Sequence, residues 1–182
     1  MNIYTNAETQ AAQASDKLAA VGKTYTLGIA EQKIGRAPDK LVTLGLGSCV
    51  GVALFDPVLK LGGMIHIMLP SAPSSGQVSN LSKFADTGIP ELLRQMIQSG
   101  ARAGRLVAKL AGGAHMFNTM YNTDVLNVGE RNAQECRRIL KANAIAIAAE
   151  DTGGTNGRSI EFCCETGVLQ VRTVSPRSIQ LL

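Results

Sequence analysis

One long apolar stretch constrains the fold of this chain more than any other feature. Residues Leu41–Leu69 are dense in Val, Ile, Leu and Gly, and an Asp56-Pro57 pair divides them. Asp followed by Pro is typical of a type I turn, so the flanking residues 50–55 and 63–69 are expected to pair as antiparallel strands. The stretch therefore predicts the centre of a β-sheet.

Two helices are expected outside this stretch. The first is predicted by apolar residues that recur on one helical face, namely Ile89, Leu92, Leu93, Met96 and Ile97. Asp86 or Thr87 is expected to cap its start and Gly100 to end it, and a second helix is expected over residues 129–142. Further strands are expected near residues 25–29, 106–110, 145–149, 159–164 and 168–174. This mixture predicts an α/β domain of α+β character, with mixed sheets and two main helices.

Length and composition predict one globular domain. The chain has 182 residues, 45% of them hydrophobic and 18% charged, which is enough apolar material for a sizeable core. Residues 1–24 are polar and lack sustained periodicity, so they are expected to form a flexible N-terminal extension to a single domain over residues 25–182.

Several classes of function are disfavoured by the same composition. The formal net charge is +4, but no basic run is longer than Arg137-Arg138, aromatic residues make up 4%, and Trp is absent, which argues against nucleic-acid binding. No apolar run approaches the roughly 20 residues of a membrane span, and the start has no secretion signal, so we expect a cytoplasmic protein without membrane insertion. Four cysteines without a Cys-x-x-Cys pair, and only two histidines, predict neither a metal site nor a cofactor.

The glycine-rich segment Thr43–Gly51 is the most informative local motif. Its glycines do not match the dinucleotide spacing G-x-G-x-x-G, and no Gly-Lys-Ser/Thr follows, so a phosphate-binding loop is disfavoured. A tight bend here would present Cys49 as a nucleophile, with amides of the turn at Gly47 and Ser48 forming an oxyanion hole. The alternative is that Cys49 is a small buried hydrophobic residue, as most free cysteines are.

Hairpin geometry offers Cys49 a base. If the turn is centred between Pro57 and Val58, Cys49 lies directly opposite His66, with Cβ atoms about 5 Å apart. A bend centred on Leu46 would similarly bring Thr43 opposite Cys49, where its hydroxyl would accept a hydrogen bond from the imidazole and fix the tautomer. The alternatives are that His66 is a core histidine and that Thr43 is an ordinary strand residue.

A series of motifs in this order resembles the CheD family of bacterial chemotaxis proteins. They are residues 41–50, Asp56-Pro57, residues 62–70, residues 111–114, Asn127-Val128-Gly129, Arg131-Asn132 and residues 150–154. The resemblance implies a layered α/β/β fold and hydrolysis of selected glutamine side chains to glutamate in methyl-accepting chemoreceptors. It places the catalytic cysteine, histidine and threonine of the family at Cys49, His66 and Thr43. It also implies receptor cytoplasmic helices as partners and, in some relatives, the phosphatase CheC.

Two other functions remain open from the sequence. The same cysteine chemistry could act on another amide or ester, as in transglutaminases or receptor methylesterases. The chain could instead be a non-catalytic module that docks on receptor helices or on CheC.

Overall fold

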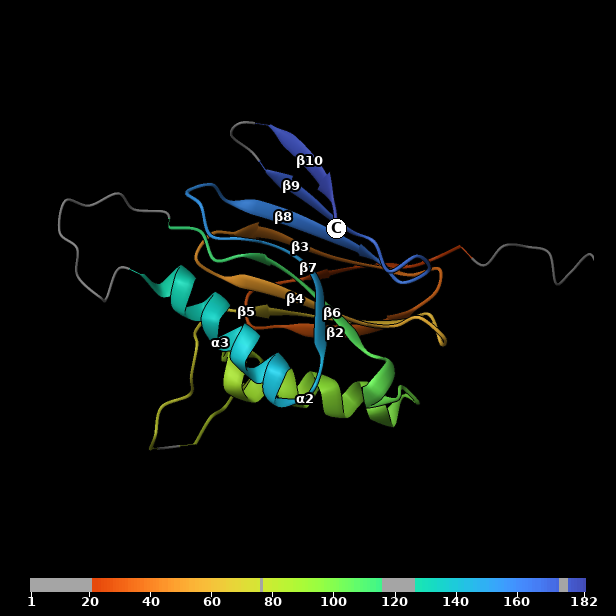
Figure 1. Cartoon of the computed structure of the whole chain (residues 1–182), viewed down its shortest axis with the longest axis horizontal. Coiled ribbons are helices and arrows are strands. Elements are labelled where there is room, and N and C mark those ends of the chain that lie inside the picture. The colour runs from red at the N-terminus through yellow and green to blue at the C-terminus, as the bar shows by residue number, and fades with distance from the viewer. Residues whose placement is uncertain (1–20, 76, 116–126, 174–176) are drawn as a thin grey trace, which may run out of the picture.

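The computed structural model describes residues 21–75, 77–115, 127–173 and 177–182, and their strands form two mixed five-stranded sheets (Figure 1). Sheet A has the order β1 (Thr24–Leu27), β3 (Lys40–Leu46), β8 (Arg158–Cys163), β9 (Leu169–Thr173) and β10 (Ser178–Leu181). Sheet B has the order β2 (Gln32–Arg36), β5 (Leu61–Ile67), β4 (Val50–Asp56), β6 (Val107–Gly112) and β7 (Ala146–Thr152). The predicted α/β class with mixed sheets is confirmed.

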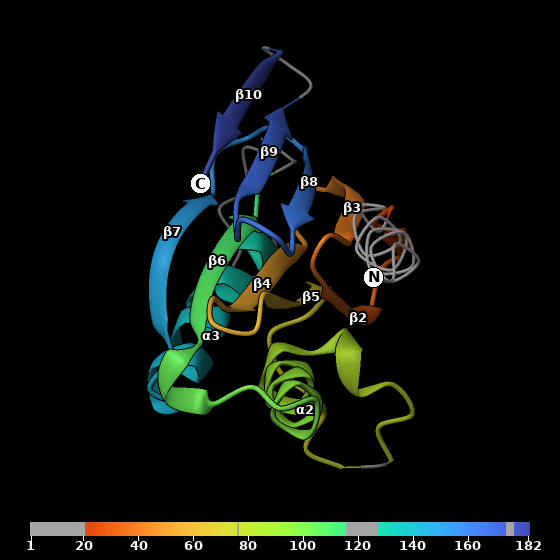
Figure 2. The ribbon, with the colours of Figure 1, turned by 90° about the vertical axis from the view of Figure 1, so that its right-hand side faces the viewer.

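The molecule has three layers, with sheet B in the middle (Figure 2). Helices α2 (Ala85–Gln98) and α3 (Val128–Ala142) pack on one face of sheet B, and sheet A packs on the other face. Side chains alternate between the two interfaces, so that Val52 of β4 contacts the helix side while Phe55 contacts sheet A. Every residue of β4 and β5 is therefore buried, which explains their nearly continuous apolar sequence.

The two expected helices are present, and Gly100, predicted to end the first, follows its C-cap residue Ser99 with a φ of 100°, but the predicted N-terminal cap of that helix is absent. Helix α2 begins at Ala85, so Asp86 lies inside its first turn, and its carboxylate accepts hydrogen bonds from the Ala72 amide at 3.0 and 3.1 Å. Helix α3 begins after Asn127, whose side chain makes no capping hydrogen bond. The prediction of Asp86 or Thr87 as the cap of α2 was wrong because the Asp86 carboxylate binds the preceding loop instead.

The turn between β4 and β5 is longer than its Asp-Pro signature suggested. Residues 57–60 form the loop, and Asp56 pairs with Leu61. The Asp56 carboxylate accepts hydrogen bonds from the amides of Val58 and Leu59, at 3.0 and 3.2 Å. The centre of the turn thus lies between Val58 and Leu59, one residue later than predicted.

This longer turn changes the register at the other end of the hairpin. Gly51, not Cys49, lies opposite His66, and the ladder ends where Val50 pairs with Ile67. The prediction that Cys49 lies directly opposite His66 was therefore wrong. Because the shift amounts to two residues, the position of Cys49 remains in phase with the face on which His66 lies.

Strands β2 and β10 were not anticipated. β2 contains Gln, Lys and Arg among its five residues, and all four residues of β10 are exposed. Both are edge strands. The β2 sequence lacks regular apolar alternation, whereas β10, Ser-Ile-Gln-Leu, has it over only four residues, and the sequence interpretation missed it. Residues 1–20 of the expected N-terminal extension lie outside the described residues.

Candidate active site

Several elements of both sheets converge at one end of the molecule (Figure 1). Strands β3 and β5 end there, β4 begins there, and the bend of residues 47–49 carries the chain from sheet A to sheet B. Cys49 lies on this bend, His66 on β5 and Thr43 on β3. The structure thus brings the three predicted residues to one region, from two different sheets.

A chain of hydrogen bonds connects His66 to sheet A. The Thr43 hydroxyl oxygen lies 2.7 Å from His66 Nδ1 and 2.9 Å from the carbonyl oxygen of Leu27. The single hydroxyl hydrogen is donated to the Leu27 carbonyl, because that oxygen can only accept. Thr43 must therefore accept a hydrogen bond from His66 Nδ1–H.

This arrangement fixes the tautomer of the imidazole. With the proton on Nδ1, the Nε2 atom of the neutral ring carries a lone pair. Within the described part of the chain, Nε2 is buried and has no hydrogen-bond partner. Burial also lowers the pKa of His66 below its ordinary value of 6.5, so the ring is neutral near pH 7. His66 is thus prepared to accept a proton at Nε2.

Thr43 reaches His66 by a different route from the one predicted. β3 does not turn back at Leu46. It runs on to that residue beside β8, with an irregularity between Thr43 and Leu46 where Gly45 has a φ of 71°. The predicted bend centred on Leu46 is wrong, and Thr43 contacts the imidazole across the interface between the two sheets.

Cys49 is partly exposed and packs beside the cluster between the sheets. Burial raises the pKa of its thiol above the ordinary value of 9.0, so the resting group is S–H. Among the described residues, no hydrogen bond joins this thiol to His66. The resting site therefore holds a neutral thiol and a neutral imidazole, and catalytic hydrogen bonds of this kind often tighten only when substrate binds.

The bend around Cys49 is held by its carbonyl groups. The carbonyl oxygens of Gly47 and Cys49 accept hydrogen bonds from the amides of Ala114 and Gly113, each at 2.8 Å. In a trans peptide the C=O of one residue and the N–H of the next point in opposite directions. The Ser48 amide therefore points away from Ala114, and its role as an oxyanion donor stays a prediction.

The glycines of the Ala111–Ala114 motif explain this close approach. A Cβ on Gly112 would overlap the Cys49 carbonyl oxygen, and Gly112 has a φ of 111°. A Cβ on Gly129, at the start of α3, would overlap the backbone of Gly113 and Ala114. The role of these motifs could not be read from the sequence, because it depends on contacts between distant segments.

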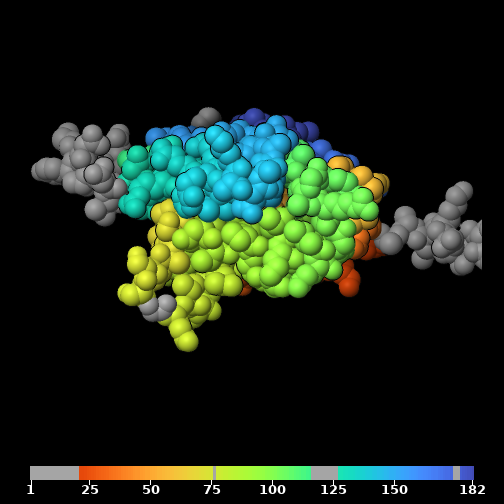
Figure 3. Space-filling model, turned by 60° about the horizontal axis from the view of Figure 1, so that its bottom comes forward, coloured from red at the N-terminus to blue at the C-terminus, as the bar shows by residue number. Residues whose placement is uncertain are grey.

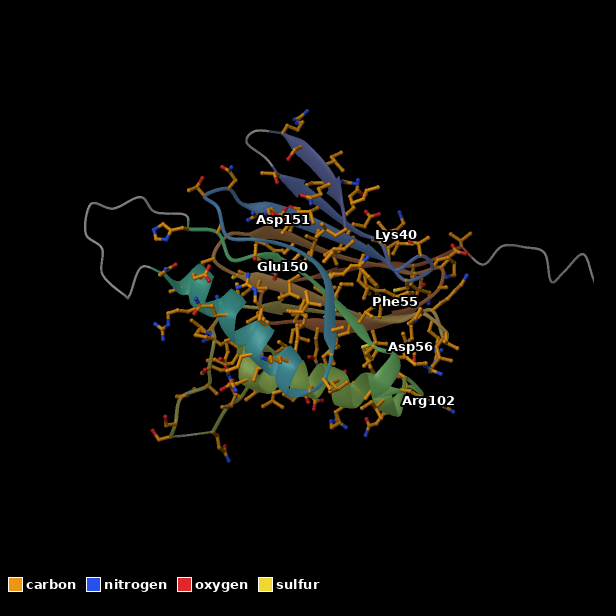
Figure 4. All side chains as sticks on the ribbon, viewed as in Figure 1. Lys40, Phe55, Asp56, Arg102, Glu150 and Asp151 are labelled. Atoms are coloured by element: carbon orange, nitrogen blue, oxygen red, sulfur yellow. The ribbon has the colours of Figure 1, made fainter. Side chains whose placement is uncertain are left out.

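Two ion pairs link the end of β7 to β8 and to α3. Asp151 pairs with the buried Arg158 of β8 at 2.9 Å, and Glu150 pairs with Arg137 of α3 at 3.0 Å. Figure 4 places Glu150 and Asp151 together on this strand, whereas Asp56 and Arg102 lie at the other end of the molecule. The ion pairs join sheet A, sheet B and α3 near the bend.

A surface groove lies between α3 and the segment that follows β5. One cavity of about 310 Å³ and a neighbouring one of about 220 Å³ share Pro70, Ser71 and Arg131 in their walls. In Figure 3 the segment that follows β5, drawn in yellow, meets α3 on this face of the molecule. Leu69 in the wall of the smaller cavity follows His66 by three residues in the sequence, and the walls of the two cavities include none of Thr43, Cys49 and His66.

Comparisons with known proteins identify the family. The family described as "CheD chemotactic sensory transduction" matches residues 68–173. A protein of Caldanaerobacter subterraneus subsp. tengcongensis named "Probable chemoreceptor glutamine deamidase CheD" is 49% identical over 152 residues, which are 84% of this chain and 94% of that protein. The chain belongs to the CheD family.

Two further comparisons complete this result. A protein of the same name from Syntrophomonas wolfei subsp. wolfei is 47% identical over 85% of this chain and 96% of its own length. The crystal structure of the Bacillus licheniformis hypothetical protein YfiH is 16% identical, covers 67% of this chain and 50% of its own, and has a TM-score of 0.43, which is too low to support an argument. In the described part of the CheD chain, no helix is long and apolar enough to span a membrane.

Proposed function

We propose that this chain is a cytoplasmic enzyme that hydrolyses glutamine side chains of chemoreceptors to glutamate and releases ammonia. The names of its relatives support this substrate, and the hydrogen bond from His66 Nδ1–H to Thr43 supports the chemistry, because it leaves Nε2 as a base near Cys49. The matched residues 68–173 begin after His66, so the roles of Thr43, Cys49 and His66 rest on geometry and on the family resemblance.

The proposed reaction is an acyl transfer in two stages. His66 Nε2 takes the Cys49 proton while the sulfur attacks the glutamine Cδ, and turn amides stabilise the oxyanion. The intermediate collapses as the C–N bond breaks, the leaving nitrogen takes the proton from His66, and ammonia departs. Water then loses a proton to His66 and attacks the thioester. The thiolate leaves with that proton, so the net change is glutamine plus water to glutamate plus ammonia.

The groove along α3 supports a protein substrate. It has an apolar wall at Leu69 and Val128, and the Arg131 side chain is exposed beside it. A receptor helix could lie there while one glutamine side chain reaches Cys49. Binding of CheC to this chain stays a prediction.

The test is mass spectrometry of a chemoreceptor cytoplasmic fragment incubated with the protein. We expect a gain of about one dalton at selected glutamines, because an amide becomes an acid, together with stoichiometric ammonia. Cys49→Ala should abolish both and still bind the fragment, while Cys163→Ala, which removes another partly exposed thiol, should keep both.

Other outcomes separate the alternatives. Cross-linked product would indicate a transglutaminase, and methanol would indicate a methylesterase. Full activity in Cys49→Ala would remove Cys49 from the mechanism. Receptor binding without any product from the unmodified protein would identify a binding module.

A further inference from the structure

Asn132 of α3 connects the bend that carries Cys49, the proposed nucleophile, to the segment that follows β5, the strand of the proposed base His66. Its side chain is fully buried, and its Nδ2 atom donates hydrogen bonds to the carbonyl oxygens of Ser48 and Met68, at 2.9 and 3.0 Å. The amide orientation is set by chemistry, because two carbonyl oxygens require a donor. Ser48 directly precedes Cys49, and Met68 follows His66 by two residues.

The side chain occupies a fork in sheet B. The β4–β5 ladder ends at the pair Val50 and Ile67. Beyond it, the Cys49 carbonyl accepts from Gly113 of the β6 side, while the Met68 amide donates to Lys83 at 3.1 Å. The two chains thus diverge toward different neighbours, and the Asn132 amide bridges them where ladder hydrogen bonds are no longer made.

We propose that Asn132 is a positioning residue that sets the distance and alignment between the Cys49 thiol and His66 Nε2. The proposal rests on the function proposed above. One amide group fixes the backbone next to the nucleophile and the backbone next to the base, so displacement of either is resisted by the same side chain. Asn132 does not touch the reacting atoms.

A second observation concerns the other end of the amide. Among the described residues, Asn132 Oδ1 is buried without a hydrogen-bond partner. An unpaired buried acceptor destabilises the folded chain, and an apolar side chain at this place would avoid that cost. The two hydrogen bonds that Asn132 Nδ2 donates to the carbonyl oxygens of Ser48 and Met68 offset the cost of the unpaired oxygen. This favours a role for the amide group beyond filling space.

Alignment matters here because the resting site holds no ion pair. The thiol must give its proton to His66 as it attacks, and a misplacement of about 1 Å can cost roughly 100-fold in rate. Loss of alignment should therefore lower kcat while the KM for substrate is unchanged.

The test compares Asn132→Ala with Asn143→Ala. Asn143 is the C-cap residue of α3, at the end of the helix that is remote from the fork. Its side chain also donates a hydrogen bond to a backbone carbonyl, that of Ile139 at 2.8 Å. The kcat and KM for deamidation of the receptor fragment are measured per folded molecule at about pH 7, with folded protein quantified by circular dichroism. Activity of the unmodified protein and its loss in Cys49→Ala are established first in the same assay.

For Asn132→Ala we expect kcat at about pH 7 to fall roughly 10- to 100-fold with KM unchanged. Asn143→Ala should keep both its kcat and its KM. A kcat within about twofold of the unmodified protein, or a loss that appears in KM and not in kcat, would overturn the proposal. If Asn132→Ala does not fold, Asn132→Gln, which keeps the donors on a longer stem, is judged by the same criteria. Absence of deamidation in the unmodified protein would contradict the proposed function itself.

Discussion

At the scale of single residues, one hydroxyl determines which nitrogen of His66 acts as the base. Thr43 donates its hydrogen to Leu27 and so accepts from Nδ1–H. Thr43→Val keeps the shape but removes this acceptor, so the ring proton is no longer held away from Nε2. We expect kcat for deamidation to fall about 100-fold with little change in KM. Thr43→Ser, which retains the hydroxyl, should keep most of the activity; equal losses in both variants would contradict the role of the hydroxyl.

The pKa of His66 predicts the acid limb of the pH profile. Burial lowers this pKa below 6.5, so the neutral base persists to lower pH than in a free histidine. As pH falls through the lowered pKa, the ring becomes protonated and activity is lost. The acid midpoint of kcat/KM should therefore lie below 6.5 in an ammonia-release assay. A midpoint above that value would show that a different group, or a more exposed imidazole, controls the reaction.

At the scale of elements, the bend before β4 depends on the glycines that end β6. Gly112→Ala places a methyl group against the Cys49 carbonyl at a φ of 111°. We expect a loss of about 1–3 kcal/mol in the free energy of unfolding and, because the bend moves, a lower kcat. Gly100→Ala is the matched control, since its φ is 100° but its Cβ would meet only Leu59 at 3.7 Å. It should lose stability and keep its kcat. Both are measured by urea unfolding and ammonia release.

The sequence predicted strands correctly where burial on both faces of a sheet requires a continuous apolar run. β4 and β5 are buried on both faces, and their apolar run identified them. The hairpin register was missed because the Asp56 carboxylate stabilises a longer loop through the amides of Val58 and Leu59. A shift of two residues kept His66 and the Cys49 position in phase, whereas a shift of one would have separated them.

At the scale of the whole molecule, stability and chemistry are located at opposite ends of sheet B. Asp56, fully buried, accepts hydrogen bonds from the Arg105 guanidinium at 2.6 and 3.0 Å and from the Arg102 amide at 3.2 Å (Figure 4). Burial would raise the pKa of this carboxyl, but Arg105 and the backbone amides lower it below 3.8, so it is ionised near pH 7.

Asp56→Ala should therefore cost about 3 kcal/mol in the free energy of unfolding, because it leaves the Arg105 charge without its partner. Deamidation per folded molecule should be unchanged, since the site lies at the other end of the sheet. Glu161→Ala, which breaks the exposed pair with Lys40, is the control and should cost less than about 1 kcal/mol. Urea unfolding and ammonia release measure the two effects. Comparable losses in both variants would show that burial does not distinguish these ion pairs.

The amino-acid sequence by itself determined the α/β class, the two helices and the buried hairpin. These follow from local patterns, since periodicity and turn residues act over short distances along the chain. Thr43, Cys49 and His66 were named from the resemblance to the CheD family and from strand registers that the structure corrects. Only the tertiary structure decided that Thr43 reaches the imidazole from the other sheet, that the Gly112 backbone supports the bend, and that Asn132 spans the fork. Each of these is a contact between segments far apart in sequence, and it exists only because the layers pack together and bury the groups that form it.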